Sequence, residues 1–198
     1  MIDRILVEAA AFGSRPKDTI AFVTYAGAVT RAQNIGRTQS YGAELVAGVR
    51  LARAVALTAN YTRLVTEQLS VEPAFDGRAI PRQPGHTFRA RAELAGALVG
   101  HAAAVSTSAE YQAESFLDPA NLGRVPGRML VGAGASLAIT RALTMTATVE
   151  NLANTRIVNL PLDPPPGPTF TSTPVALTDV AGFPLPGRSF YLALQWTH

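Results

Sequence analysis

One stretch near the end of the sequence decides the fold: Leu143-Thr144-Met145-Thr146-Ala147-Thr148-Val149-Glu150. Apolar and polar residues alternate in it with a period of two. An extended strand sends successive side chains to opposite faces, so this stretch forms one apolar face and one polar face. The apolar face carries Leu143, Met145, Ala147 and Val149. The pattern predicts a strand that lies between two different environments.

Six further segments alternate in the same way. They are Gly36 to Leu51, Val55 to Thr62, Phe88 to Leu94, Ala103 to Gln112, Met129 to Ile139 and Ser189 to Trp196. The residues before them, Ile2 to about Tyr25, predict either one long strand or two short strands that meet near Pro16. The sequence therefore predicts about eight antiparallel strands, of which the first is the least regular.

The connections between these segments alternate in length. Tight turns are expected at residues 52–54, 96–100 and 140–142, and long links at residues 67–85, 116–126 and 152–187. Short turns on one side and long loops on the other are typical of outer-membrane β-barrels. The longest link contains Pro164-Pro165-Pro166-Gly167-Pro168, which cannot donate to a β-ladder and is expected to stand in solvent.

The composition excludes two other classes of protein. Hydrophobic residues make up 47% of the chain and charged residues only 16%, against roughly 25% charged residues in soluble domains. The longest apolar run, Leu94 to Val105, contains His101 and two glycines, so no membrane-spanning helix is predicted. The net charge of +3 comes from scattered arginines, so no nucleic-acid groove is expected.

The two faces of the predicted strands fit lipid on one side and water on the other. Strands survive in a bilayer only as a closed barrel, because every backbone polar group must be paired there. Tyr61 and Tyr111 are expected at one lipid boundary and Trp196 at the other, as aromatic girdle residues. Arg63 also faces outward, close to the headgroups. The predicted fold class is all-β, an antiparallel up-and-down transmembrane β-barrel segment of about eight strands.

Two alternative folds remain open at this point. A soluble β-sandwich or lipocalin-like barrel would turn the apolar face into a core, although that face is rich in alanine rather than bulky residues. The alanine-rich stretch from Arg89 to Tyr111 also has helix propensity and would form a helical hairpin. Its two glycines and its alternating polar residues favour strands instead.

The tail of the chain carries the most specific motifs. Val149-Glu150-Asn151-Leu152-Ala153-Asn154, a long link and then Pro186-Gly187-Arg188-Ser189-Phe190 resemble the "v-x-N-L-x-[DN]" and "P-G-R-x-[FY]" ending of TonB-dependent receptors. Upstream, Asn34 to Leu45 is similar to that family's "N-x-G-x-x-x-x-x-G-x-E" strand. Ala56 to Thr62 and Ile80 to His86 resemble its "l-x-a-n-Y-t" strand and the loop that follows. The order and spacing of these motifs make the resemblance specific.

The resemblance implies a barrel of about 22 strands around an N-terminal plug, which imports scarce ligands such as siderophores, cobalamin or carbohydrates. The implied partners are outer-membrane lipid, the barrel-assembly machinery, the plug domain and a TonB-type energy coupler. We expect residues 1–198 to be a single β-barrel domain, the C-terminal portion of a larger barrel without a plug. No export signal is evident at Met1, so we expect the tail of a longer protein or a truncated remnant.

No catalytic chemistry is predicted. The three histidines, His86, His101 and His198, have no metal-ligand spacing, and we assign no catalytic residue, metal site or cofactor. Seven charged residues are expected on the lumen side and to pair mainly with one another, although contact with a plug or ligand stays open. They are Glu44, Arg50, Arg89, Arg91, Glu93, Glu110 and Glu150.

The leading hypothesis from the sequence is a barrel segment of a TonB-dependent transporter. The alternatives are a free-standing eight-stranded outer-membrane barrel with a structural or adhesive role and a soluble ligand-binding β-domain. Eight strands leave a lumen that side chains must fill, but inward positions such as Thr58, Gly132 and Thr146 are small. This favours a wider parent barrel. The loops contain no sequence motif that identifies the ligand.

Overall fold

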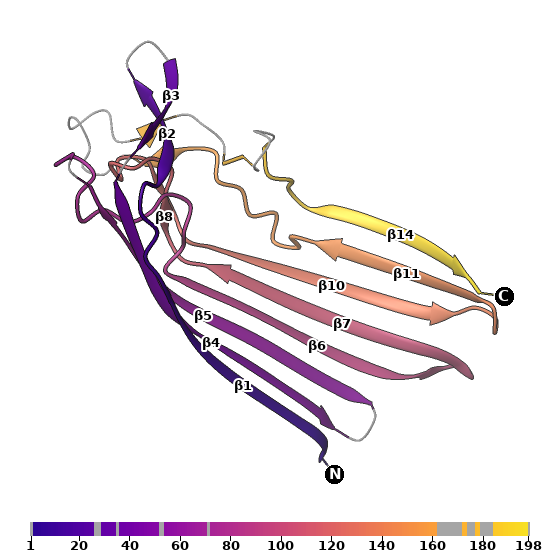
Figure 1. Ribbon diagram of the computed structural model, residues 1–198. Helices are drawn as coiled ribbons and strands as arrows, with labels where there is room; N and C mark the ends of the chain where they lie inside the picture. Colours follow the sequence, from indigo (N-terminus) through magenta and orange to yellow (C-terminus); the bar gives the residue numbers. More distant parts are fainter. Residues whose placement is uncertain are drawn as a thin grey trace.

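The computed structural model is an eight-stranded antiparallel sheet in one curved layer (Figure 1). It describes residues 2–25, 29–34, 36–51, 54–70, 72–161, 172–173, 177–178 and 184–197. In order across the sheet the strands are β1 (Ile2–Ser14), β4 (Arg37–Leu51), β5 (Val55–Leu69), β6 (His86–Leu98), β7 (His101–Gln112), β10 (Arg128–Ala138), β11 (Leu143–Glu150) and β14 (Ser189–Trp196). Each strand pairs with its neighbours in this order, so the sheet is an up-and-down meander.

Three small hairpins lie in the long links at one end of the sheet. They are β2 (Ile20–Tyr25) with β3 (Val29–Asn34), β8 (Ser115–Phe116) with β9 (Arg124–Val125), and β12 (Leu160–Pro161) with β13 (Ser172–Thr173). Both chain termini lie at the opposite end, beside the short turns (Figure 1). The predicted division into a short-turn end and a long-link end is confirmed. The turn residues 52–53, the Pro164–Pro168 run and His198 lie outside the described residues.

The predicted strands are all present, with some different bounds. The segments Leu143–Glu150 and Ser189–Trp196 are confirmed residue for residue. The strand expected to end at Thr62 continues to Leu69, and the turn expected at 96–100 contains only Val99 and Gly100. The helical hairpin is wrong, because β6 and β7 pair along their whole length.

The first predicted strand is two strands, and only one of them belongs to the wall. β1 ends at Ser14 and pairs with β4. The second piece, β2, turns away and pairs with β3 in a separate hairpin, which stands above the sheet in Figure 1. The link of residues 15–36 is therefore a fourth long connection that the sequence did not predict as such.

The pairing register places all the predicted apolar faces on the same side of the sheet. One row of directly opposed residues shows this: Leu45, Tyr61, Phe88, Tyr111 and Met129. The next row towards the short turns is Ala47, Ala59, Ala90, Ala109 and Val131. Because register sets which side chains share a face, the sheet has one continuous apolar face, called here the outer face. The opposite, polar side is called the inner face.

Within the part of the chain that the structure describes, no second layer covers the outer face of the sheet. Among the described residues, the only buried hydrophobic side chains are Val125 and Leu160, both outside the eight-stranded sheet. Leu57 and Leu192 on the outer face are 40% and 70% exposed. A soluble sandwich would bury these side chains in a dry core, so the soluble alternative is wrong. Such a wide exposed apolar surface requires a partner other than water.

The two end strands leave the sheet open. Within the described residues β1 pairs only with β4, and β14 only with β11. Each end strand therefore presents an unpaired row of backbone donors and acceptors, which is a template for further strands. None of the described residues forms a helix that is long and apolar enough to cross a membrane.

The turn between β6 and β7 stores backbone strain. Val99 and Gly100 both have positive φ, 52° and 83°, which suits a two-residue hairpin turn of the kind that favours Asn-Gly. A β-branched residue is strained in this region, and Val99 is 90% exposed and gains little from packing.

We expect Val99→Asn to raise the free energy of unfolding by about 1 kcal/mol, because asparagine tolerates the left-handed backbone. Urea unfolding of the refolded chain in detergent, followed by tryptophan fluorescence from Trp196, measures the change. Gly100→Ala is the opposite control and should destabilise the same turn. Equal stability of Val99→Asn and the unchanged chain would contradict the assigned strain.

Candidate functional site

The inner face carries a hollow of about 700 Å³ between the sheet and the last long link. Its wall side is formed by polar side chains of β5, β6, β7 and β10: Thr58, Asn60, Arg89, Arg91, Ser108, Glu110 and Arg128. Its link side is mainly apolar and includes Ile157, Val158, Leu177, Leu185 and Pro186. The hollow is therefore amphipathic, with charged groups on the barrel wall and apolar groups on the link that folds over it.

A chain of hydrogen bonds organises the charged side of the hollow. The Arg89 guanidinium lies 3.3 Å from the Glu110 carboxylate across β6 and β7. The same carboxylate accepts a hydrogen bond of 2.8 Å from the Gln112 amide, and the Gln112 oxygen accepts one of 3.0 Å from Arg128. Since this network connects three neighbouring strands, it fixes the direction of its two guanidinium groups.

The hollow has an excess of positive charge. Four arginines, at 89, 91, 128 and 156, and two glutamates, at 110 and 150, line it. Arg91 pairs with Glu93 at 3.2 Å, and the Arg91 side chain is 56% exposed. Guanidinium groups in a partly enclosed site attract carboxylates, phosphates and other oxyanions, with which they form bidentate hydrogen bonds. The geometry is suited to an anionic group that has an apolar part beside it.

The predicted pairing of inner charges is confirmed for part of the set. Arg89 pairs with Glu110 and Arg91 with Glu93. The other three predicted charges, Glu44, Arg50 and Glu150, make no ion pair with any described residue, and only Glu150 lines the hollow. Two cationic residues of the hollow, Arg128 and Arg156, were missed. Arg128 precedes the predicted strand by one residue, and Arg156 belongs to a link without any periodicity.

The two tail motifs meet at the rim of the hollow. Asn151 is 7% exposed and has a positive φ of 49°. Its side-chain oxygen accepts a hydrogen bond from the Thr155 N–H at 2.8 Å, and its amide donates to the carbonyls of Thr155 and Pro186 at 2.9 and 3.4 Å. The Asn154 oxygen accepts from the Arg188 N–H at 2.9 Å. These two asparagines therefore tie the start of the last link to its end.

We expect Asn151→Ala to destabilise this closure by about 2 kcal/mol, because buried backbone groups lose their partners. Arg156 lies just beyond the closure and is exposed, so the rate of tryptic cleavage after Arg156 in the refolded chain measures the opening. Asn159→Ala is a matched control, since Asn159 is exposed and its side chain makes no hydrogen bond with a described residue. Equal cleavage rates for the two variants would contradict the role of Asn151.

Two other long links are joined above the sheet by buried amides. Gln68 is 0% exposed, and its amide donates to the carbonyls of Ala79 and Pro119 at 2.9 and 2.8 Å. The Asn121 oxygen accepts from the Ala79 N–H at 2.8 Å. These contacts join the links of residues 70–85 and 113–127 into one unit. No alternation pattern predicted them, because both amides act through backbone groups far away in the sequence.

The two described histidines lie at opposite ends of the sheet. His86 lies on the outer face opposite Arg63, and His101 lies at the short-turn end, where Nδ1 donates to the Ala138 carbonyl at 2.8 Å. Among the described residues there is no group of three potential metal ligands from histidine, cysteine, aspartate and glutamate.

A single curved antiparallel sheet with an apolar outer face, a polar inner face and long links at one end is the wall of an outer-membrane β-barrel. The family comparison is more specific: the model of the "TonB dependent receptor-like, beta-barrel" family matches residues 2–152. The chain belongs to this family. It is a receptor barrel segment rather than an enzyme, and it resides in the outer membrane of a Gram-negative bacterium.

Solved structures agree with this fold. The ferric yersiniabactin uptake receptor FyuA from Yersinia pestis superposes with a TM-score of 0.75 at 15% identity, over 98% of this chain and 28% of that receptor. The copper transporter OprC gives 0.70 at 18% identity, over 99% and 29%. The siderophore receptor PiuA from Acinetobacter baumannii gives 0.66 at 18% identity, over 97% and 26%. The chain thus spans less than a third of each of these structures, and no curated protein matches it by sequence.

Proposed function

We propose that this chain forms part of the wall of a TonB-dependent transporter that imports a scarce nutrient, and that the inner hollow contacts the ligand during its passage. The observation that carries the proposal is the combination of guanidinium groups and apolar link residues around one cavity. We further propose that residues 1–198 act as one domain, the C-terminal portion of a larger barrel. The unpaired edges of β1 and β14 are the sites where further strands would continue the wall.

The chemistry of the hollow favours an anionic chelate with an apolar part. Several structurally similar receptors are named for ferric yersiniabactin, ferric citrate or ferripyoverdine. Ligands of that class combine acidic metal-binding oxygens with an organic scaffold. Arg89 and Arg128 would attract the acidic groups, and the apolar link residues around Ile157 would cover the scaffold. The plug domain and the energy coupler are the proposed partners of the whole receptor.

Uptake of radioactive iron tests the proposal. The receptor that contains this wall segment, together with its plug domain, is expressed in a Gram-negative host without its own ferric receptors, and uptake is measured with a panel of ferric siderophores and ferric citrate. We expect one chelate to be taken up only when TonB is present. Replacing both Arg89 and Arg128 by glutamine should reduce that uptake by about tenfold.

The control variant is Arg141→Gln, which removes the same kind of charge at the exposed turn between β10 and β11. It should leave uptake unchanged. Uptake that is independent of TonB, or an equal rate in the double variant and in the control, would overturn the proposal.

A further inference from the structure

Two arginines lie side by side on the inner face, near the short-turn end of the sheet. Arg4 of β1 is directly opposite Arg50 of β4 in the pairing register. Directly opposed residues of an antiparallel pair have Cα atoms about 4.5 to 5.5 Å apart, and their side chains leave the same face of the sheet. Both side chains are exposed. These two residues are called here the arginine pair.

The face on which the pair lies follows from the next row of the sheet towards the long links. That row contains Leu6, Gly48 and Thr58. A Cβ on Gly48 would lie 3.7 Å from the Cβ of Leu6 and 3.9 Å from Cγ2 of Thr58, and Thr58 lines the hollow of the inner face. Arg4 is two residues before Leu6, and Arg50 is two residues after Gly48. Because alternate residues of a strand share a face, both arginines belong to the inner face.

The charge of the arginine pair is not neutralised by any described residue. None of the three ion pairs among these residues includes Arg4 or Arg50. The carboxylate in the same row is that of Glu93, which lies two strands away from Arg50 across Ala56, roughly 10 Å at the usual spacing of strands. Glu93 already pairs with Arg91 at 3.2 Å. Like charges directly opposite each other destabilise a sheet, and an anion between them removes this cost.

The surroundings of the pair leave room for such an anion. Ala56, opposite Arg50 on β5, and Gly48, two residues before Arg50 on β4, have no side chain that could reach the guanidinium groups. Each guanidinium has five N–H donors in a planar fork that matches the two oxygens of a carboxylate. Two forks from adjacent strands can therefore turn towards one ligand that carries several carboxylate groups.

From the register, the shared face and the missing counter-charge we propose that the arginine pair is a second oxyanion site of the inner face, which binds the carboxylate groups of a small anionic ligand. Along β6, Arg89 of the hollow is four residues from Glu93, the residue level with the pair, or roughly 13 Å along the strand. The pair thus lies between the hollow and the short-turn end, which is the periplasmic side of an outer-membrane barrel. An anion that leaves the hollow towards the periplasm passes this site. The identity of the ligand rests on the proposed function, whereas the binding of a carboxylate does not.

Chemical modification of arginine tests this site in the full chain, refolded in zwitterionic detergent. Phenylglyoxal reacts with free guanidinium groups, and mass spectrometry of the peptides gives the rate at each arginine. We expect citrate to slow the modification of Arg4 and Arg50 by about fivefold or more. Sodium chloride at the same ionic strength should have a much smaller effect, because it only screens charge. Arg141, at the exposed turn between β10 and β11, is the internal control and should react equally fast in both salts.

Two variants of Arg50 separate binding from simple repulsion. Arg50→Gln removes half of the site, so citrate should no longer protect Arg4. Arg50→Glu creates an opposed ion pair with Arg4, so it should raise the urea midpoint of unfolding without any anion and abolish the response to citrate. In the unchanged chain citrate should raise this midpoint, because a ligand that binds the folded state stabilises it. Arg141→Gln is the matched control and should keep both the protection and the shift in midpoint.

Equal protection by citrate and by chloride, or protection of Arg4 that persists in Arg50→Gln, would overturn the proposal. Stronger protection by inorganic phosphate than by citrate would overturn the assignment to carboxylate ligands. Protection of both arginines in the whole receptor before any anion is added would also overturn it, since other residues of the receptor would then neutralise the pair. None of these results depends on uptake, so this proposal and the proposed function can fail separately.

Discussion

Replacing Gly42 by alanine is expected to prevent stable pairing of β4 with its neighbours. A Cβ at this position would lie 2.7 Å from the Cζ atom of the Phe12 ring and still closer to the backbone carbonyl of Arg63. Real Cβ atoms do not approach backbone so closely, and the carbonyl cannot move without breaking the β4–β5 ladder. Overpacking of this kind costs about 1 to 3 kcal/mol or more. We expect a loss of folded, protease-resistant chain.

The matched control for Gly42→Ala is Gly96→Ala in β6. A Cβ on Gly96 would meet no atom within 4 Å, so this variant should fold normally. The double variant Phe12→Ala with Gly42→Ala separates the two clashes, since it removes the ring but leaves the carbonyl. The yield of refolded chain and its resistance to trypsin measure all three variants. Full stability of Gly42→Ala alone would contradict the close approach of β4 and β5.

The two glycines of the motif that contains Gly42 are needed for different structural reasons, which the sequence alone does not distinguish. It is the second glycine of the Asn34 to Leu45 motif, and the first, Gly36, has a φ of 91° and donates its N–H to the Asn34 side chain at 2.8 Å. One glycine is therefore required by a turn and the other by a close strand contact. The spacing of the motif was visible in the sequence, but the two different physical reasons were not.

The seven alternating strands were predictable because lipid and water impose opposite demands on the two faces. The alternation of apolar and polar residues is expected only along the part of a strand that faces lipid. This explains why β5 was predicted to end at Thr62, too early. β5 continues from Arg63 to Leu69, where Gln39 and Glu67 are hydrogen-bonded on the outer face and Arg15 joins Gln39 at 3.1 Å. Backbone pairing persists there, but polar and apolar residues occur on both faces, so alternation no longer reveals the strand.

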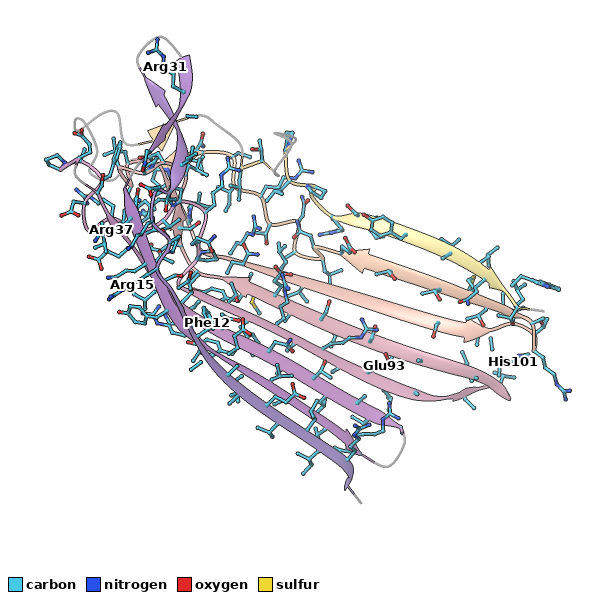
Figure 2. The ribbon with its side chains drawn as sticks, viewed as in Figure 1. Phe12, Arg15, Arg31, Arg37, Glu93 and His101 are labelled. Atoms are coloured by element: carbon cyan, nitrogen blue, oxygen red, sulfur yellow. The ribbon has the colours of Figure 1, made fainter. Side chains whose placement is uncertain are left out.

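The candidate site was less predictable than the wall. Charges such as Arg89 and Glu110 were found because they occupy the polar positions of alternating strands, but their function depends on which link covers them. That link starts at Asn151 and folds back over the inner face through contacts with residues about 35 positions later. Such contacts have no local pattern. Figure 2 shows Arg15 and Arg37 at the long-link end of the sheet and His101 at the short-turn end. The end at which a residue lies depends on the order and direction of the strands.

A single arginine at the middle of the outer face is expected to destabilise the protein strongly in a membrane. Ala147 is exposed on the outer face, in the row that also contains Ala135 and Leu192. It lies between the row that contains Tyr61 and Tyr111 and the row that contains Trp196. A lipid-facing arginine costs about 2 to 4 kcal/mol near the bilayer midplane and about 0 to 1 kcal/mol near the interfaces. We expect Ala147→Arg to lower the free energy of unfolding by about 2 to 4 kcal/mol, the value for the bilayer midplane.

The control for Ala147→Arg is Thr146→Arg, one residue earlier on the same strand. Its side chain points to the inner face, where water and the polar wall accommodate a cation, so it should cost much less. Urea unfolding of both variants in lipid vesicles measures the difference. The two variants carry the same charge at neighbouring positions of β11, so they differ mainly in the face of the sheet on which the arginine lies. A larger loss for Thr146→Arg than for Ala147→Arg would reverse the two faces of the sheet, because the apolar side would then not be the lipid side.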